Sequence, residues 1–146
     1  MIFCDVNVLV YAFRKSSVDH AKYREWLTTQ LDGDEPVALN AVVDSGFVRL
    51  VTNRRAFKDP STVTAALDFI AAIREAPITA PLHEGARHWE IFDRLCRRVG
   101  AKGKLVPDAY LAALAIESGS TLYSTDRDFA KFPGLRWRHP LEDDED

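Results

Sequence analysis

The chain has 146 residues, of which 47% are hydrophobic and 28% charged, and this composition excludes a disordered or fibrous protein. Such a length suits one domain with a single core. No apolar run approaches the roughly 20 residues needed to cross a bilayer, and the two cysteines, Cys4 and Cys96, show no disulfide framework spacing. We therefore expect a cytoplasmic protein with reduced, buried thiols.

The charge of the chain is unevenly distributed. The formal net charge is −3, but the last five residues are all acidic, so residues 1–141 carry 19 basic and 17 acidic side chains, a net charge of +2. We expect a folded domain over 1–141 and a disordered acidic tail over 142–146. A slightly basic body suits an anionic substrate, but a solvated tail on a neutral domain explains the charge equally well.

Short apolar runs alternate with helix-periodic segments along the whole chain. The expected elements are a strand at 1–4, helices over 6–12 and 18–31, a strand at 36–39, helices over 41–53 and from about 59 to 73, a strand at 77–80, helices over 84–99 and 107–119, a strand at 121–124, a short helix around Phe129 and Phe132, and a strand at 135–139. This alternation predicts an α/β fold in which helices cover both faces of a parallel sheet of four to five strands. The helix over 84–99 is expected to bury Trp89, Phe92, Cys96 and Val99.

Three aspartates lie directly after an expected strand or at the start of an expected helix. Asp5 follows the first strand, Asp126 follows the strand at 121–124, and Asp108 stands after Pro107 in the first turn of a helix. Each of them, taken singly, is explained as a turn residue or a helix N-cap. In open α/β sheets, however, ligands collect at the carboxyl ends of the strands. The three acids are therefore candidates for a common site.

Asp44 differs from these acids because it lies inside the apolar helix over 41–53. A charge there needs solvent, a partner or a metal. Several carboxylates gathered in one small domain would repel one another unless a cation or protons offset their charge. The pattern therefore favours a metal site, although an exposed helix position explains Asp44 alone.

Other motifs in the chain do not match a known catalytic arrangement. His83 and His88 are five residues apart, which places them about 140° apart on a helix and prevents them from binding one ion from the same face. The segment 100–104 lacks the spacing of a phosphate-binding loop and the Ser or Thr that follows Gly-Lys. The remaining candidate ligands are carboxylates, and sites built from oxygen ligands favour Mg²⁺ or Mn²⁺.

The sequence resembles the PIN-domain ribonucleases, most closely the VapC-type toxins of bacterial type II toxin–antitoxin pairs. The resemblance covers nearly the whole chain and implies a three-layer α/β/α PIN-like domain over 1–141. It is carried by Asp5-Val6-Asn7-Val8-Leu9, Val43-Asp44-Ser45-Gly46-Phe47-Val48-Arg49 with Thr52-Asn53, Val106-Pro107-Asp108-Ala109-Tyr110-Leu111-Ala112-Ala113-Leu114-Ala115, and Ser124-Thr125-Asp126-Arg127-Asp128-Phe129.

The resemblance also implies an acidic site for Mg²⁺ or Mn²⁺. Asp5, Asp108 and Asp126 match the metal-binding acids of the family. Asp44 completes the expected catalytic set at a position where most members have glutamate, and Asp128 is a reserve candidate. A further departure is Val6, because many relatives carry Thr or Ser directly after the first acid. Asn7 is expected to supply the hydrogen bond that this hydroxyl would make.

The function implied by the resemblance is that of a metal-dependent endoribonuclease and toxin. The expected partners are an RNA (tRNA, rRNA and mRNA are not distinguished), a cognate antitoxin protein that blocks the acidic pocket, and a second copy of the chain in a homodimer. For any one candidate phosphate contact, ordinary surface charge is the more common explanation; the candidates are Arg14, Lys15, Arg49, Arg54, Arg55, Lys102 and Lys104. Residues that belong either to a partner surface or to the core are Tyr23, Trp26, Leu27, Phe57 and Phe69.

Two other functions fit parts of the sequence. A non-catalytic RNA-binding or regulatory module on the same fold would explain a site weakened by Asp44 and Val6. A haloacid-dehalogenase-like phosphohydrolase would use the aspartate after the first strand as its nucleophile. Asp5-Val6-Asn7, however, lacks the second aspartate that such enzymes place two residues further on.

Overall fold

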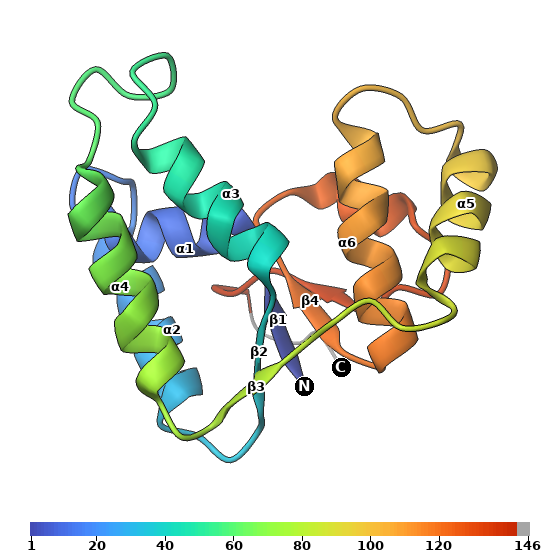
Figure 1. The fold of residues 1–146 in the computed structure, drawn as a ribbon, viewed down its shortest axis with the longest axis horizontal. Coiled ribbons are helices and arrows are strands. Elements are labelled where there is room, and N and C mark those ends of the chain that lie inside the picture. The colour runs from blue at the N-terminus through green and yellow to red at the C-terminus, as the bar shows by residue number, and fades with distance from the viewer. Residues whose placement is uncertain (143–146) are drawn as a thin grey trace.

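Strands and helices alternate as the sequence predicts in the computed structural model, which describes residues 1–142 (Figure 1). In chain order the elements are β1 (Ile2–Cys4), α1 (Val6–Phe13), α2 (His20–Leu31), β2 (Val37–Leu39), α3 (Ala41–Val51), α4 (Val63–Glu75), β3 (Thr79–Pro81), α5 (His88–Val99), α6 (Leu105–Ser118), β4 (Thr121–Tyr123), the 3₁₀ helix η1 (Arg127–Lys131) and β5 (Trp137–Arg138). The three-layer α/β/α fold expected from the sequence is confirmed.

The five-stranded sheet is parallel and has the order β3-β2-β1-β4-β5. β1 pairs with β2 on one side and with β4 on the other, so that Ile2 lies opposite Thr121 and Cys4 lies opposite Tyr123. The chain moves outward from β1 to β3 and then returns to the other side of β1. The strand order therefore reverses between β1 and β4, which is where ligands bind in open α/β sheets.

The helices form two groups with the strands between them (Figure 1). In one group α1 packs on α2 and α3, and α3 packs on α4, whereas α5 packs on α6 in the other. A Cβ added to Gly46 of α3 would lie 3.4 Å from the side chain of Val6 at the start of α1. This close approach holds α3 beside the carboxyl end of β1.

Polar caps determine where the helices of the first group begin. Asn40 caps α3 through its side-chain oxygen and is itself buried. Thr62 caps α4 by accepting a hydrogen bond from the Ala65 N–H at 3.1 Å. The helix expected to start near Asp59 therefore starts at Val63, because the threonine satisfies an N–H group of the first turn.

The buried face of α5 differs from the expected one. Trp89 is 71% exposed, so the expectation that it is buried is wrong, and the buried residues are instead His88, Ile91 and Leu95. His88 is tolerated inside because its Nε2 lies 3.0 Å from the carbonyl oxygen of Tyr110, within hydrogen-bonding distance. The other residues expected on the buried face are half-buried: Phe92, Cys96 and Val99.

The segment before α5 is a turn rather than the first turn of the helix. The carboxylate of Glu117 accepts hydrogen bonds from the backbone N–H groups of Gly85 at 2.6 Å and Arg87 at 2.9 Å. Because these groups are held by α6, the helix expected from residue 84 begins at His88.

The aromatic residues with two possible roles belong to the core. Tyr23 and Leu27 are buried, and Trp26, Phe57 and Phe69 are half-buried and pack against the core cluster. Their positions decide this alternative of the sequence analysis in favour of packing.

Three remaining expectations concern the membrane, the cysteines and the tail. No helix within residues 1–142 is both long and apolar enough to cross a membrane. Both cysteines are unpaired; burial raises the pKa of the Cys4 thiol to about 12, while Cys96 is only half-buried. Glu142, the first residue of the expected tail, forms an ion pair with Arg127, and residues 143–146 lie outside the described residues.

Candidate active site

Asp5 forms the buried end of the candidate site. It follows β1 directly and caps α1, where its Oδ1 accepts a hydrogen bond from the Val6 N–H at 2.7 Å. Burial raises the pKa of its carboxyl and the charges of Asp108 and Asp126 raise it further, while hydrogen bonds from Ser124 and Val6 oppose this shift. The charged form of Asp5 is therefore favoured by any cation placed next to it.

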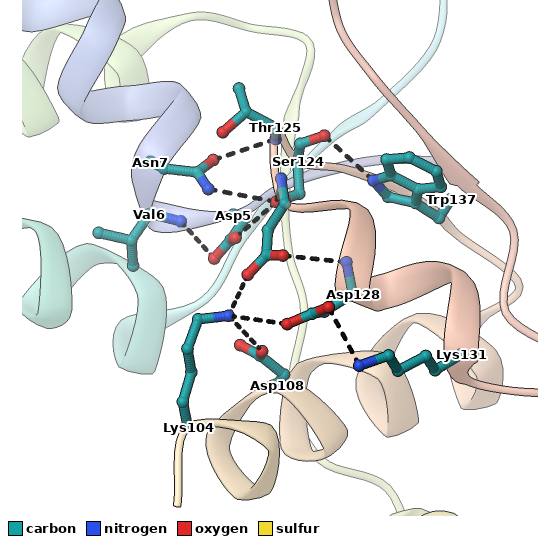
Figure 2. A network of polar contacts seen from close by, with 11 residues as sticks. Asp5, Val6, Asn7, Lys104, Asp108, Ser124, Thr125, Asp128, Lys131 and Trp137 are labelled. Atoms are coloured by element: carbon teal, nitrogen blue, oxygen red, sulfur yellow. Dashed lines mark hydrogen bonds and ion pairs between the residues drawn. The ribbon is translucent and has the colours of Figure 1, made fainter. Parts of the chain in front are cut away.

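Ser124 connects Asp5 to the end of β4 (Figure 2). Its fully buried hydroxyl donates to Asp5 Oδ2 at 2.8 Å, and the same oxygen accepts hydrogen bonds from the Asp126 N–H at 3.0 Å and from Asn7 Nδ2 at 3.3 Å. Asn7 Oδ1 in turn accepts from the Thr125 N–H at 3.4 Å. Asn7 thus supports Asp5 through Ser124, and this network fixes the carboxylate at the switch point.

Three further carboxylates surround a single ammonium group (Figure 2). Asp126 caps η1 by accepting from the Asp128 N–H at 2.9 Å, and Asp108 lies in the first turn of α6. Lys104 Nζ donates to Asp126 and lies 3.3 Å from Asp108 Oδ2 and 3.6 Å from Asp128 Oδ2. The structure therefore brings Asp108, Asp126 and the reserve candidate Asp128 together, with Asp5 close enough to interact electrostatically.

The carboxylates differ in how readily they ionise. Burial raises the pKa of Asp108, and Lys104 opposes this shift only in part. Burial also acts on Asp126, but hydrogen bonds from Lys104 and the Asp128 N–H outweigh it and lower the pKa of that carboxyl. The hydrogen bond to Asp126 raises the pKa of the Lys104 ammonium, which keeps its charge. Asp126 therefore ionises at a lower pH than Asp5 and Asp108.

A cavity of about 980 Å³ lies beside Asp5 and Asp108. Its walls come mainly from α3 and α6, with one residue of α5 at the edge, and most of the lining side chains are apolar. The lining residues are Asp5, Val6, Val42, Val43, Ser45, Gly46, Arg49, Phe92, Val106, Pro107, Asp108, Tyr110 and Leu111. A cavity of this size can admit an extended ligand next to the carboxylates.

The structure does not bring Asp44 into this group. Its Oδ2 accepts hydrogen bonds from Nε and a terminal nitrogen of Arg74 on α4, at 3.1 and 2.6 Å, and it lines a separate small cavity with Cys4. Residues two apart on a helix point about 200° from each other. Because Val42 faces the large cavity, Asp44 faces away from it. In this structure Asp44 therefore lies apart from the other expected catalytic acids, and it joins α3 to α4.

The candidate phosphate-binding residues occupy different environments. Arg14 is engaged within the domain, where it donates to Ser61 at 3.0 Å and lies over the ring of Phe57 at 4.0 Å. Arg49 is exposed and lines the large cavity, whereas Lys104 belongs to the acidic group. The remaining candidates are exposed surface residues: Lys15, Arg54, Arg55 and Lys102.

The carboxylates suit a hard divalent cation. Asp108, Asp126 and Asp128 already converge on a positive charge, the Lys104 ammonium, which stands in for such an ion. Within residues 1–142, no three His, Cys, Asp or Glu side chains form a ready-made metal-binding cluster. Mg²⁺, however, commonly takes only one or two protein carboxylates and completes its shell with water. The residues therefore fit the ion that the sequence resemblance implies.

Comparison with known proteins identifies the family. The sequence matches the PIN domain over residues 2–135, a range that contains all of these carboxylates. The chain belongs to the PIN-domain family. This PIN domain is also 46% identical, over 142 residues, to ribonuclease VapC43 of Mycobacterium tuberculosis, an alignment that covers 97% of each chain. It is therefore a member of the VapC ribonucleases.

Two solved structures share the fold of this PIN domain. VapBC2 of Rickettsia felis, solved bound to a DNA fragment from its promoter, has a TM-score of 0.70 and 17% identity, covering 95% of this chain and 98% of that chain. VapC20 of Mycobacterium tuberculosis, described as a toxin that cleaves the sarcin–ricin loop, has a TM-score of 0.65 and 21% identity, covering 93% of this chain and 99% of that chain. Both comparisons support the architecture.

Sequence reasoning missed two residues of this PIN-domain site. Ser124 was not recognised as the support of Asp5, although it lies in the polar end of the β4 segment. Lys104 was considered only as a phosphate contact. Its position four residues before Asp108, within one helical turn, was the available signal for an ion pair.

Ser124→Ala tests whether this hydroxyl holds the site together. The substitution removes the donor to Asp5 and the acceptor of the Asp126 N–H, and we expect it to lower the free energy of unfolding by about 1–3 kcal/mol, measured by chemical denaturation. Ser16→Ala, at an exposed serine, is the control and should change stability by no more than about 0.5 kcal/mol. Equal stability of the two variants would contradict the supporting role.

Asp5→Asn tests the electrostatic strain of the metal-free site. Because folding raises the pKa of Asp5, the folded state favours the protonated form, and wild type loses stability as the pH rises through that pKa. Asparagine is neutral and still caps a helix. In EDTA we expect the variant to melt above wild type at pH 8, with the difference shrinking as the pH falls. A variant that melts below wild type at pH 8 would refute this account.

Proposed function

We propose that this chain is an endoribonuclease that depends on Mg²⁺ or Mn²⁺ and acts as the toxin of a toxin–antitoxin pair. One observation carries the proposal. In a VapC family member, carboxylates from β1, α6 and the segment after β4 gather at the switch point of the sheet, beside a large cavity. The description of VapC20 as a toxin that cleaves the sarcin–ricin loop supports RNA as the substrate class.

Asp5, Asp108 and Asp126 would hold the metal ion, with Asp128 as a reserve ligand. When bound, the ion would neutralise a non-bridging phosphate oxygen and lower the pKa of a water molecule. Burial raises the pKa of Asp5 and of Asp108, and a bound cation would oppose that shift and favour their charged forms. Binding of the ion and ionisation of these two carboxyls would thus be coupled.

Asp126 is the residue best suited to accept a proton from the attacking water. In the metal-free chain, hydrogen bonds from Lys104 and the Asp128 N–H lower its pKa, and the Asp128 N–H bond does not depend on the lysine. Its side chain is 22% exposed, so water can reach it. Ser124 fixes the adjoining backbone by accepting from the Asp126 N–H. A positioned, ionised carboxylate is what general base catalysis requires. We assign Asp126 this role.

The substrate would be a single-stranded or looped segment of RNA. Asp5 is buried, so the scissile phosphate must enter the cavity, and a flexible strand can do this more easily than a regular double helix. Arg49 on α3 supplies a cation for a neighbouring phosphate, and Phe92 and Tyr110 supply aromatic surface for a base.

Two protein partners are proposed, an antitoxin and a second copy of the chain. A cognate antitoxin would inhibit the enzyme by covering the cavity. The structural neighbour from Rickettsia felis is described as VapBC2, which supports such a pairing. A second copy of the chain would form a homodimer, for which the exposed side chains of Val63 and Leu67 on α4 provide apolar surface. The site of action would be the cytoplasm, where RNA is found.

Induced expression in a bacterium tests the catalytic proposal. We expect wild type to arrest growth and to generate discrete new RNA 5′ ends, because the intact carboxylate group positions the ion. Asp5→Asn, Asp108→Asn and Asp126→Asn should each abolish both effects while remaining folded by circular dichroism. Identical 5′ ends from wild type and these variants would reject the assignment.

Two further assays on the purified protein separate the other functions. RNA that is bound but never cut in Mg²⁺ or Mn²⁺, without growth arrest, would indicate a non-catalytic RNA-binding module. A covalent aspartyl phosphate trapped on Asp5 would indicate a phosphohydrolase instead. Neither result is expected.

Asp44→Asn tests the separation of Asp44 from the reaction. The variant loses the charge that binds Arg74, and we expect the free energy of unfolding to fall by roughly 1 kcal/mol or less, because the arginine is partly exposed. Cleavage of RNA by the purified protein should stay within about threefold of wild type, well short of the 10²–10⁴-fold contribution of a general base. A loss in that range, with stability unchanged, would return Asp44 to the catalytic set.

A further inference from the structure

Lys104 lies at the start of α6, and only part of its environment comes from that helix. It is the N-cap residue of α6, and its side chain makes no capping hydrogen bond. The positive end of a helix disfavours a cation. The ammonium nevertheless lies within 3.6 Å of carboxylates from two separate segments, Asp108 of α6 and the pair Asp126 and Asp128 after β4. The attraction of these carboxylates therefore determines where it lies (Figure 2).

The contacts of Lys104 coincide with those expected of the metal ion. Asp108 and Asp126, which contact the ammonium, are also two of the proposed ligands. A divalent ion bound to the same oxygens would repel the ammonium at a distance where charges interact strongly. The two cations therefore cannot share these carboxylates in the arrangement seen here.

Lys104 is also able to leave. Its side chain is 63% exposed, so the ammonium can return to solvent without opening the core. A lysine has a long, flexible stem and a strongly hydrated charge, and it regains conformational entropy when released. Asp5, by contrast, is fixed by hydrogen bonds from Ser124 and Val6. Within residues 1–142, its carboxylate forms no ion pair with Lys104.

We propose that Lys104 is an internal counter-ion that competes with the divalent metal ion for the carboxylates of the site. In the metal-free chain it offsets the repulsion among Asp108, Asp126 and Asp128. Metal binding requires it to leave, so the metal affinity of this chain is set by the exchange of one cation for the other. This inference rests on the proposed metal dependence of the function.

Direct measurement of metal affinity tests the exchange. Mn²⁺ binding to purified wild type, Lys104→Met, Lys104→Arg and Lys102→Met is measured by titration calorimetry and by the electron paramagnetic resonance of free Mn²⁺. Methionine keeps much of the length of lysine without its charge, and arginine keeps the charge. Lys102, which is exposed on the same turn, controls for the general effect of removing one positive charge.

We expect Lys104→Met to bind Mn²⁺ about tenfold more tightly than wild type, a change equivalent to about 1.4 kcal/mol. Lys102→Met and Lys104→Arg should stay within about twofold of wild type, a difference well below that tenfold step. Affinity of Lys104→Met that equals wild type or is weaker overturns the inference but leaves the metal site intact. Absence of Mn²⁺ binding by every variant overturns both the inference and the proposed metal dependence.

A second measurement needs no variant and decides the matter if Lys104→Met does not fold. Lysine side chains of wild type are labelled by reductive methylation with and without Mg²⁺, and the extent at Lys104 is read by peptide mass spectrometry. Release from the carboxylates should increase its methylation severalfold when Mg²⁺ is present, while methylation of Lys102 stays constant. Unchanged methylation of Lys104 at a saturating Mg²⁺ concentration would refute the exchange.

Discussion

Repulsion between like charges is the constraint on which this site depends. The parallel sheet places the ends of β1 and β4 side by side, and the chain carries acids just beyond both strands. Asp5 and Asp126 therefore lie close enough for their charges to interact. Asp108 adds a third charge from α6. Such a group is stable only when protons, hydrogen bonds or a cation offset its charge. The hydrogen bonds that Asp5 accepts from Ser124 and Val6 and the ion pairs of Lys104 serve that requirement.

The two halves of the site meet the requirement differently. Asp5 is buried and held by the Ser124 hydroxyl and the Val6 N–H, so its carboxylate has a fixed direction. Asp108 and Asp126 are held by a long, largely exposed lysine side chain. The part that can move is therefore the lysine counter-ion, while Asp5 keeps its place at the end of β1. The fold itself supplies the rigid part.

The local sequence pattern predicts the positions of several site acids, but it does not predict the direction of side chains that depend on distant contacts. The acids after β1 and β4 could be placed because a strand end is visible in the sequence and parallel strands align their carboxyl ends. The direction of Asp44 could not be placed, because it depends on the rotation of α3 against α4, where Arg74 is a partner 30 residues away. Trp89 was misplaced for a similar reason: the pattern gave the helix, but a buried histidine shifted its inner face.

The position of Asp44 changes how the cavity works. With this acid turned toward α4, the α3 wall of the cavity presents Val42, Gly46 and Arg49, and it contributes no carboxylate. Among the lining residues from the described part of the chain, the acids are Asp5, directly after β1, and Asp108 of α6. A bound phosphodiester would then lie between a metal ion on the acidic side and an arginine on the other, so its charge would be offset from two directions.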